Sequence, residues 1–309
     1  MPKQSTSTIV MVSPDHFGFN PQTAETNPFM HTPETMHLDA HEILDTAKRE
    51  FNNMVDVLRL HGITVLILPS RSDKLTPDAV FPNNWFSHHE DGKLVLYPML
   101  TPNRRLERQT DPLRALLESA GLKDQEVIDL THDEEKNHIL ESTGSMVLDR
   151  VHKVSFAMAS PRTVQEEFEK WCKVMDYEGV YLTTPKSHRQ EVYHTNLEMC
   201  IGSDFAVVCL EVLEDVKEQA HLRSKLESLG KDVIEISLEQ VYGFCGNVLE
   251  LQSSAGEKFI LMSETAHKAF TKEQLDRLGK YVKPIVIPIP TIEEIGGGGV
   301  RCMVAEIFT

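Results

Sequence analysis

The sequence predicts an α/β fold, a five-bladed pseudo-symmetric α/β propeller, and three observations lead to it. A unit of about 50 residues recurs, with a polar or glycine-rich turn, two short apolar strands, a helix and a third strand. The helices carry apolar residues at i, i+3 and i+4 and end near glycine, as amphipathic helices do. The fifth unit is split between the two ends of the chain, which is how propeller-like folds close.

Four units lie within the chain and the fifth joins its ends. The four opening turns are FPNNWFS (81–87), ESTGSMVLDR (141–150), YHTNLEMCIG (193–202) and CGNVLELQ (245–252). The fifth opens at GGGGVRCMVAEIF, and its second strand, helix and last strand are TIVMVSP, HEILDTAKREFNNMVDVLRLHG and ITVLILP. An open doubly wound sheet also alternates strands and helices, but it does not explain the split unit. We therefore expect residues 1–309 to form one propeller domain, with its fifth blade closed by the N- and C-termini.

Composition and charge exclude several classes of protein. The hydrophobic content of 40% and the charged content of 25% are ordinary for a globular chain. The formal net charge of −16 opposes binding to nucleic acids and to anionic membranes, so neither is expected as a partner. No apolar run is long enough to span a bilayer, and the N-terminus lacks the layout of a signal peptide. Five widely spaced cysteines without a CxxC pair argue for the reducing cytoplasm.

The candidate chemistry lies in the opening turns, because equivalent positions of a pseudo-symmetric ring converge on its axis. A thiol, an imidazole and a carboxylate are among the side chains there, and they can serve as nucleophile, acid/base and orienting group. The turns deliver, in chain order, Asn84, Glu141, His194 with Asn196, Asn247, and Cys302.

These turns resemble those of the guanidine-modifying superfamily, which includes arginine deiminases, dimethylarginine hydrolases, agmatine deiminases and amidinotransferases. The matching motifs are GGGGVRC, the HTN turn, the EST turn and FPNN, and the resemblance covers essentially the whole chain. Within the superfamily, FPNNW and HTN resemble bacterial citrulline hydrolases that are often labelled amidinotransferases. The resemblance implies a five-bladed α/β propeller, or pentein, that works without a cofactor or a metal.

The resemblance also implies a role for each matching residue. Cys302 would be the nucleophile, His194 the general acid/base and Glu141 its partner. Arg104 and Arg162 would grip a substrate carboxylate, for which the guanidinium fork is suited. Arg105 is the alternative to Arg104 for binding this carboxylate. Ser142 and Thr143 stand where the family has glycines.

Two departures from the family pattern point to the substrate. Asn84 and Asn196 are amides where guanidine-cleaving members have carboxylates that clamp the cationic guanidinium. An amide matches a neutral ureido group instead, because it offers a donor for the carbonyl and an acceptor for an N–H. The sequence therefore predicts a cysteine-dependent hydrolase of a small amino acid, with citrulline as substrate and ornithine, ammonia and carbon dioxide as products.

Other readings stay open at this point. The enzyme could instead be an arginine or agmatine deiminase or an amidinotransferase, and a propeller of this shape could be a non-catalytic binding protein. A homo-oligomer is possible. Asn247 is expected to be a structural turn residue, and adjacent His88 and His89 are expected in a solvated hairpin rather than a metal site. The long polar segment 17–38 is expected to cover the substrate, with Asn20, Thr23 and Asn27 as candidate contacts.

Overall fold

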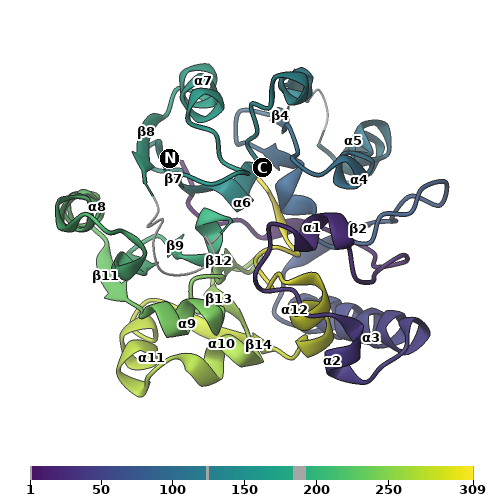
Figure 1. The fold of residues 1–309 in the computed structure, drawn as a ribbon. Helices are drawn as coiled ribbons and strands as arrows, with labels where there is room; N and C mark the ends of the chain where they lie inside the picture. Colours follow the sequence, from purple (N-terminus) through teal and green to yellow (C-terminus); the bar gives the residue numbers. More distant parts are fainter. Residues whose placement is uncertain (1, 123–124, 184–192, 309) are drawn as a thin grey trace.

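The protein consists of five small sheets arranged around a common centre, as the computed structural model shows for residues 2–122, 125–183 and 193–308 (Figure 1). Each sheet has three strands with one shared pattern. The first strand pairs antiparallel with the second, and the second pairs parallel with the third. A parallel pair needs a crossover connection, so every sheet requires a helical segment between its second and third strands.

The strands follow the predicted units closely. One sheet contains β3 (Phe86–His88), β4 (Lys93–Leu96) and β5 (Glu126–Asp129). The next two contain β6 (Met146–Asp149), β7 (Val154–Met158) and β8 (Glu178–Leu182), then β9 (Met199–Ile201), β10 (Phe205–Val208) and β11 (Asp232–Glu235). The fourth contains β12 (Leu249–Gln252), β13 (Lys258–Ser263) and β14 (Lys283–Ile287), and the fifth contains β15 (Ala305–Ile307), β1 (Thr8–Val12) and β2 (Thr64–Leu68).

The main helix of each crossover lies at the periphery, outside the strands (Figure 1). These helices are α3 (Ala40–Leu60), α5 (Thr110–Ser119), α7 (Gln165–Met175), α8 (Val216–Ser228) and α11 (Lys272–Leu278). The other described α-helices are α1 (Pro21–Ala24), α2 (Pro33–Met36), α4 (Pro102–Arg105), α6 (Ser142–Ser145), α9 (Leu238–Tyr242), α10 (Glu264–Ala269) and α12 (Pro290–Gly296). Helix α3 begins with a capping box between Asp39 and Glu42, which satisfies two N-terminal backbone groups.

The split fifth unit is confirmed, because strands from opposite ends of the chain share one sheet. Residues Thr8 to Val10 of β1 pair with Ala305 to Ile307 of β15, and β1 also pairs with β2. The five sheets fit the predicted five-bladed pseudo-symmetric architecture. Closure of the sheets into a continuous propeller stays a prediction.

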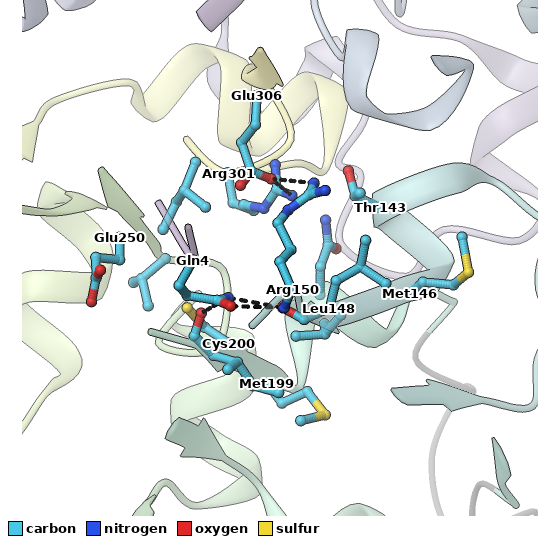
Figure 2. A pocket seen from close by; sticks show the side chains of 15 residues that line it. Gln4, Thr143, Met146, Leu148, Arg150, Met199, Cys200, Glu250, Arg301 and Glu306 are labelled. Carbon is cyan, nitrogen blue, oxygen red and sulfur yellow. Dashed lines mark hydrogen bonds and ion pairs between the residues drawn. The ribbon is translucent and has the colours of Figure 1, made fainter. Parts of the chain in front are cut away.

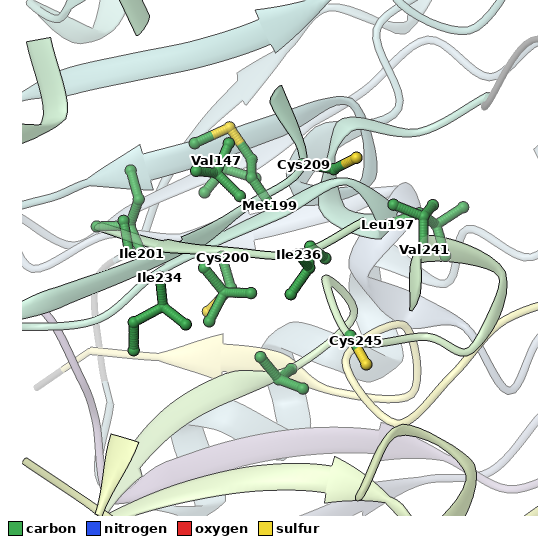
Figure 3. Packing of buried hydrophobic residues seen from close by; sticks show 14 of the residues in the cluster. Val147, Leu197, Met199, Cys200, Ile201, Cys209, Ile234, Ile236, Val241 and Cys245 are labelled. Atoms are coloured by element: carbon green, nitrogen blue, oxygen red, sulfur yellow. The ribbon is translucent and has the colours of Figure 1, made fainter. Parts of the chain in front are cut away.

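The largest apolar cluster of the described residues joins the sheets of the second, third and fourth units, and Figure 3 shows part of it. Cys200, Cys209 and Cys245 belong to this cluster, and Cys172 packs in a neighbouring one, so these four thiols serve as small hydrophobes. The sequence predicts core positions for Cys172, Cys200 and Cys209, and the structure confirms them.

One sequence expectation about the first sheet is wrong. His88 and His89 do not lie in a solvated hairpin, because both side chains are buried. His88 Nδ1 accepts a hydrogen bond from the backbone of Phe308, and His89 Nε2 contacts Ser87 Oγ at 2.8 Å. The C-terminal segment therefore covers this strand, a tertiary contact that local sequence does not encode. Among the described residues, no helix combines the length and the apolar character needed to cross a bilayer.

Candidate active site

The turns that precede the first strand of each sheet converge, and they hold the predicted site residues. The 3-10 turn Pro82–Asn84 precedes β3, α6 precedes β6, and the 3-10 turn Thr195–Leu197 precedes β9. Asn247 stands two residues before β12, and Cys302 lies in the turn before β15. All of these side chains are buried. Equivalent positions in five units thus supply one enclosed polar centre.

Glu141 and His194 form a close buried pair. His194 Nε2 lies 2.8 Å from Glu141 Oε2, and Glu141 Oε1 accepts a bond from the Leu100 backbone at 3.0 Å. Burial raises the pKa of Glu141, but the Arg162 charge and the His194 bond outweigh it and hold this pKa well below its usual range. Burial lowers the pKa of His194 to about 4, against the opposing effect of Glu141. An ionised carboxylate only accepts hydrogen bonds, so Nε2 carries the proton and Nδ1 is the basic nitrogen.

Arg162 lies behind the pair and is fully buried. Its Nη1 is 3.4 Å from Glu141 Oε2, and its Nη2 donates to the Thr23 carbonyl and to Thr26 Oγ1. Its guanidinium also stacks 4.5 Å from the Tyr193 ring centroid. Its Nε has no hydrogen-bond partner among the described residues, so one donor stays available.

Arg104, not its rival Arg105, points inward. Arg104 Nε and Nη2 donate to Glu107 at 2.9 and 3.0 Å, and Nη1 donates to Asn84 Oδ1 at 2.9 Å. Asp78 Oδ2 is 3.8 Å from Arg104 Nε. Arg105 instead donates to the carbonyls of Met99 and Leu100. The Arg104 guanidinium is therefore already paired with the Glu107 carboxylate. That Arg104 binds a substrate carboxylate stays a prediction.

Cys302 faces amides rather than charged groups. Its Sγ lies 3.3 Å from Asn247 Nδ2 and 3.8 Å from Asn196 Nδ2. Burial raises the pKa of the Cys302 thiol, and the Asn247 hydrogen bond is the largest effect that lowers it. The structure thus brings Cys302, Asn196 and Asn247 together on one side, and Glu141, His194 and Asn84 on the other. Within the described residues, no hydrogen bond joins the Cys302 thiol to the His194 ring.

Glycines allow the turns to approach one another closely. A Cβ on Gly144 would lie 3.0 Å from His194 Nδ1 and closer still to Asn84 Nδ2, so this position leaves no room for a side chain. A Cβ on Gly246 would overlap the Leu197 carbonyl oxygen in the HTN turn. Ser142, two residues before Gly144 in the same turn, has a backbone φ of 46°, which is a strained value for a residue with a side chain. Ser142 Oγ donates to the Phe86 carbonyl at 3.0 Å, which helps to hold this turn where the family has glycine.

The segment 17–38 is tied to the site, but its three candidate residues bind the protein. Asn20 Nδ2 and Thr23 Oγ1 donate to Asp78 Oδ2 at 2.7 and 2.6 Å. Asn27 Nδ2 donates to Tyr193 Oη at 3.1 Å, and Tyr193 Oη donates to the Gly297 carbonyl at 2.8 Å. These bonds fasten the segment to the first unit and to the loop before Cys302.

A small polar cavity adjoins the site. Its volume is about 30 Å³, and Asn196 and Thr143 form part of its lining. On its far side the side chains of Arg150 and Arg301 converge on Glu306 (Figure 2). Gln4 binds the backbones of Leu148, Ile201 and Arg150 there. The N-terminal segment therefore joins two units through one buried side chain.

Three side chains of the kinds that bind metal ions lie close together outside the candidate active site. In the part of the chain that the structure describes, Asp133, His138 and Glu167 place one ligand atom each within 4.8 Å of one another. Lys136 and Lys170 already pair with Asp133, and Lys170 also approaches Glu167. Two ammonium groups thus neutralise the two carboxylates, so this group is a structural ion-pair network.

Sequence reasoning did not single out three residues that contact the site, Glu107, Asp78 and Tyr193. Asn247 was named in the fourth opening turn and expected to be a structural turn residue, and the structure adds its contact with Cys302. Glu107 follows Arg104 by three residues, a spacing that pairs side chains on a helix. Asp78 and Tyr193 carry no local signal, because their partners lie in the segment 17–38 and in the loop before Cys302.

The fold and the site define a hydrolase of the amidinotransferase superfamily that acts on C–N bonds other than peptide bonds. The family model described as "N,N dimethylarginine dimethylhydrolase, eukaryotic" matches residues 13–309, so the chain belongs to this family. No curated relative matches the sequence.

Solved structures share this fold at low sequence identity. The N-terminal domain of ArgZ, an arginine dihydrolase of cyanobacteria captured as a cysteine-to-serine mutant with substrate, has a TM-score of 0.72 at 16% identity, covering 97% of this chain and 98% of that one. Unliganded AgrE has a TM-score of 0.74 at 18% identity, covering 97% of this chain and 39% of that one. A cysteine-to-serine mutant of DDAH from Pseudomonas aeruginosa, in complex with citrulline, has a TM-score of 0.67 at 16% identity, covering 98% and 99%.

Proposed function

We propose that the protein hydrolyses the ureido group of citrulline to ornithine, ammonia and carbon dioxide, with Cys302 as nucleophile. The observation that carries this proposal is the orientation of the Asn84 amide. Arg104 donates to Asn84 Oδ1, so the oxygen is occupied, and buried Nδ2 has no hydrogen-bond partner among the described residues. A free donor beside His194 needs an acceptor. A ureido carbonyl is an acceptor, whereas a guanidinium has only donors.

The charges of the site also favour a neutral ureido substrate over a cationic guanidino substrate. Glu141 is neutralised by Arg162 and Glu107 by Arg104, and the contacts of the Cys302 thiol are with the amides of Asn196 and Asn247. A neutral substrate suits amides, because a buried cation without a carboxylate partner is costly. The Arg104 guanidinium next to Asn84 also repels a cationic group. Arg104 would thus act on the substrate through Asn84, and the free Nε of Arg162 would bind the substrate carboxylate.

The proposed reaction has two steps. The Cys302 thiol gives its proton to Nδ1 of the neutral His194 ring, the thiolate attacks the ureido carbon, and Nδ1 passes this proton to the leaving amine as a C–N bond breaks. Water, activated by the same imidazole, then attacks the thiol-linked carbonyl, breaks the C–S bond and regenerates the thiol, and the released carbamate breaks down to carbon dioxide and the second amine. One water is consumed for each ornithine, ammonia and carbon dioxide formed. His194 suits both steps, because Glu141 orients the ring and leaves Nδ1 free to exchange a proton.

The proposal also covers the domain organisation of the enzyme and its cellular compartment. We take residues 1–309 as a single five-bladed domain whose sheets close into a ring, since β1 and β15 join the ends of the chain. All five cysteines are free thiols, in keeping with a reducing cytoplasm.

A second candidate is hydrolysis of a methylated or free arginine, and the matched family favours it. Amino-acid analysis of products from citrulline, arginine, agmatine and dimethylarginine separates the two candidates. We expect ornithine from citrulline with the wild type and with Cys172→Ala, a matched buried cysteine, and no product with Cys302→Ala. Robust turnover of a guanidino substrate without ornithine from citrulline would contradict the proposal. No turnover of any substrate would favour the non-catalytic reading.

A further inference from the structure

Among the described residues, the thiol of Cys302 has no unpaired positive charge to activate it. Burial opposes its ionisation, and the charges of Arg301 and Arg104, which favour it, are each already paired with a carboxylate, Glu306 and Glu107. A nearby imidazolium could stabilise a thiolate, but burial lowers the pKa of His194 to about 4, and its Nε2 is engaged by Glu141. A cationic substrate could also do so, but on the proposed function, on which this inference rests, the ureido group is neutral. The protein itself must therefore supply the stabilising groups.

The contacts of Cys302 differ from those of the other cysteines. Burial raises the pKa of Cys172, Cys200, Cys209 and Cys245 to about 12. The Cys245 thiol, for example, contacts a backbone acceptor, the Ala266 carbonyl at 3.6 Å. Cys302 instead receives two side-chain amide N–H groups, and the nearer belongs to Asn247 at 3.3 Å. The amide oxygens of Asn247 and Asn196 lie farther from the sulfur than the Asn247 nitrogen, at 3.8 and 4.0 Å. Donors stabilise a thiolate and acceptors do not.

The local structure holds the nitrogen of the Asn247 amide toward the sulfur. Asn247 Nδ2 donates one hydrogen bond to Asn196, whose backbone oxygen is 3.0 Å and whose side-chain oxygen is 3.4 Å away, and its second hydrogen is directed to Cys302 Sγ. The Asn247 backbone donates to the Phe244 carbonyl at 2.9 Å. Gly246 permits this turn to lie against the HTN turn, because any Cβ there would overlap the Leu197 carbonyl. The amide is thus oriented before any substrate arrives.

We propose that Asn247 is a catalytic residue that stabilises the thiolate of Cys302 by donating the Nδ2 hydrogen bond, and so replaces the positive charge that a ureido substrate lacks. Asn196 assists at the longer distance of 3.8 Å. A hydrogen bond to a charged group is roughly twice as strong as a neutral one, so the bond strengthens when the thiol ionises.

The test measures the ionisation of Cys302 in the ligand-free enzyme. The rate of alkylation by iodoacetamide is followed against pH, with Cys302→Ala as the blank for the four core thiols. We expect Asn247→Leu to raise the thiol pKa by about one to two units. Asn247→Asp has the same shape but offers a carboxylate, so it raises this pKa further. Asn53→Asp, on the exposed face of α3, adds the same charge and leaves the profile unchanged.

Kinetics separate this role from a structural one. The kcat/KM of Asn247→Leu falls about tenfold or more at neutral pH and recovers at alkaline pH, where the thiol ionises without help. A folded Asn247→Leu or Asn247→Asp enzyme with the wild-type thiol pKa would overturn the inference. Because the alkylation assay needs no substrate, a shifted thiol pKa without citrulline turnover would overturn the proposed function and leave the role of Asn247 standing.

Discussion

The two sides of the candidate site differ in charge. One side holds Glu141, Arg162, Arg104, Glu107 and Asp78, and their charges contact one another or the segment 17–38. The other side holds Cys302 between the amides of Asn196 and Asn247. The charged groups thus hold the elements of the site together, whereas uncharged amide donors contact the Cys302 sulfur, the proposed nucleophile. The proposed selection of a neutral substrate depends on this contrast.

The largest expected effect comes from breaking the charged side at Glu141. Glu141→Gln removes the charge that pairs with Arg162 and the acceptor that orients His194. We expect kcat to fall by about 10²–10⁴-fold and the free energy of unfolding to drop by about 3–5 kcal/mol, because Arg162 remains buried and unpaired. Steady-state kinetics and urea unfolding measure both effects. Glu118→Gln, on the exposed face of α5, is the matched control. Wild-type kcat in Glu141→Gln would remove Glu141 from the proposed machinery.

The next prediction adds a charge at Asn84, the amide that lies on the charged side of the comparison. Asn84→Asp replaces the free Nδ2 donor with a carboxylate and pairs it with Arg104. The ureido carbonyl loses its donor, so kcat/KM for citrulline falls about tenfold to a hundredfold, by the roughly 1–3 kcal/mol of an unsatisfied polar group. Binding of a guanidino competitor improves at the same time. Inhibition by arginine, measured beside Asn52→Asp on the exposed face of α3, reports that gain. Unchanged citrulline kinetics would contradict the role given to Asn84.

The sequence repeat predicted both the five-unit architecture and the proposed reacting groups. The repeat assigns Glu141, His194 and Cys302 to equivalent turns, and turns of one type meet at the centre of a symmetric arrangement. It could not assign partners that depend on tertiary contacts. Asp78 binds Asn20 and Thr23 from a distant segment, so residues expected to touch substrate turned out to bind the protein.

Arg104 and Arg162 also show that the sequence alone does not identify tertiary partners. A guanidinium matches a carboxylate of the protein as well as it matches one of a substrate. The folded structure pairs Arg104 with Glu107 and Arg162 with Glu141, and it leaves Nε of Arg162 without a partner among the described residues. The i,i+3 spacing of Arg104 and Glu107 was readable from the sequence, whereas the contact between Arg162 and Glu141 spans two elements.

The pH dependence of stability tests the neutral imidazole on the charged side. Burial lowers the pKa of His194 from 6.5 to about 4, so the unfolded chain binds this proton more readily than the folded one. The contribution of His194 is therefore complete above pH 6.5 and is lost as the pH falls toward 4. Burial raises the pKa of Glu107 to about 7, which acts with the opposite sign, so a variant must isolate the imidazole.

The variant for this test is His194→Gln. We expect the difference in unfolding free energy, wild type minus variant, to decrease by about 2 kcal/mol between about pH 7.5 and about pH 5. Urea titrations at the two pH values measure it, and His41→Gln, an exposed histidine of α3, should leave the difference flat. A flat difference for His194→Gln would mean that the imidazole is charged in the folded protein.

The smallest expected effect concerns the bonds that join the segment 17–38 to the thiol side. Tyr193 Oη accepts from Asn27 and donates to the Gly297 carbonyl, so this hydroxyl connects the covering segment to the loop before Cys302. Tyr193→Phe keeps the ring that stacks on Arg162 and removes both bonds, at about 1 kcal/mol for a typical net hydrogen bond. We expect KM for citrulline to rise about fivefold with kcat nearly unchanged, because the charged pair and the amides stay in place. Tyr281→Phe, whose hydroxyl bonds Asp232 far from the site, is the control. A fall in kcat with constant KM would instead place the Tyr193 hydroxyl among the groups that act on the thiol.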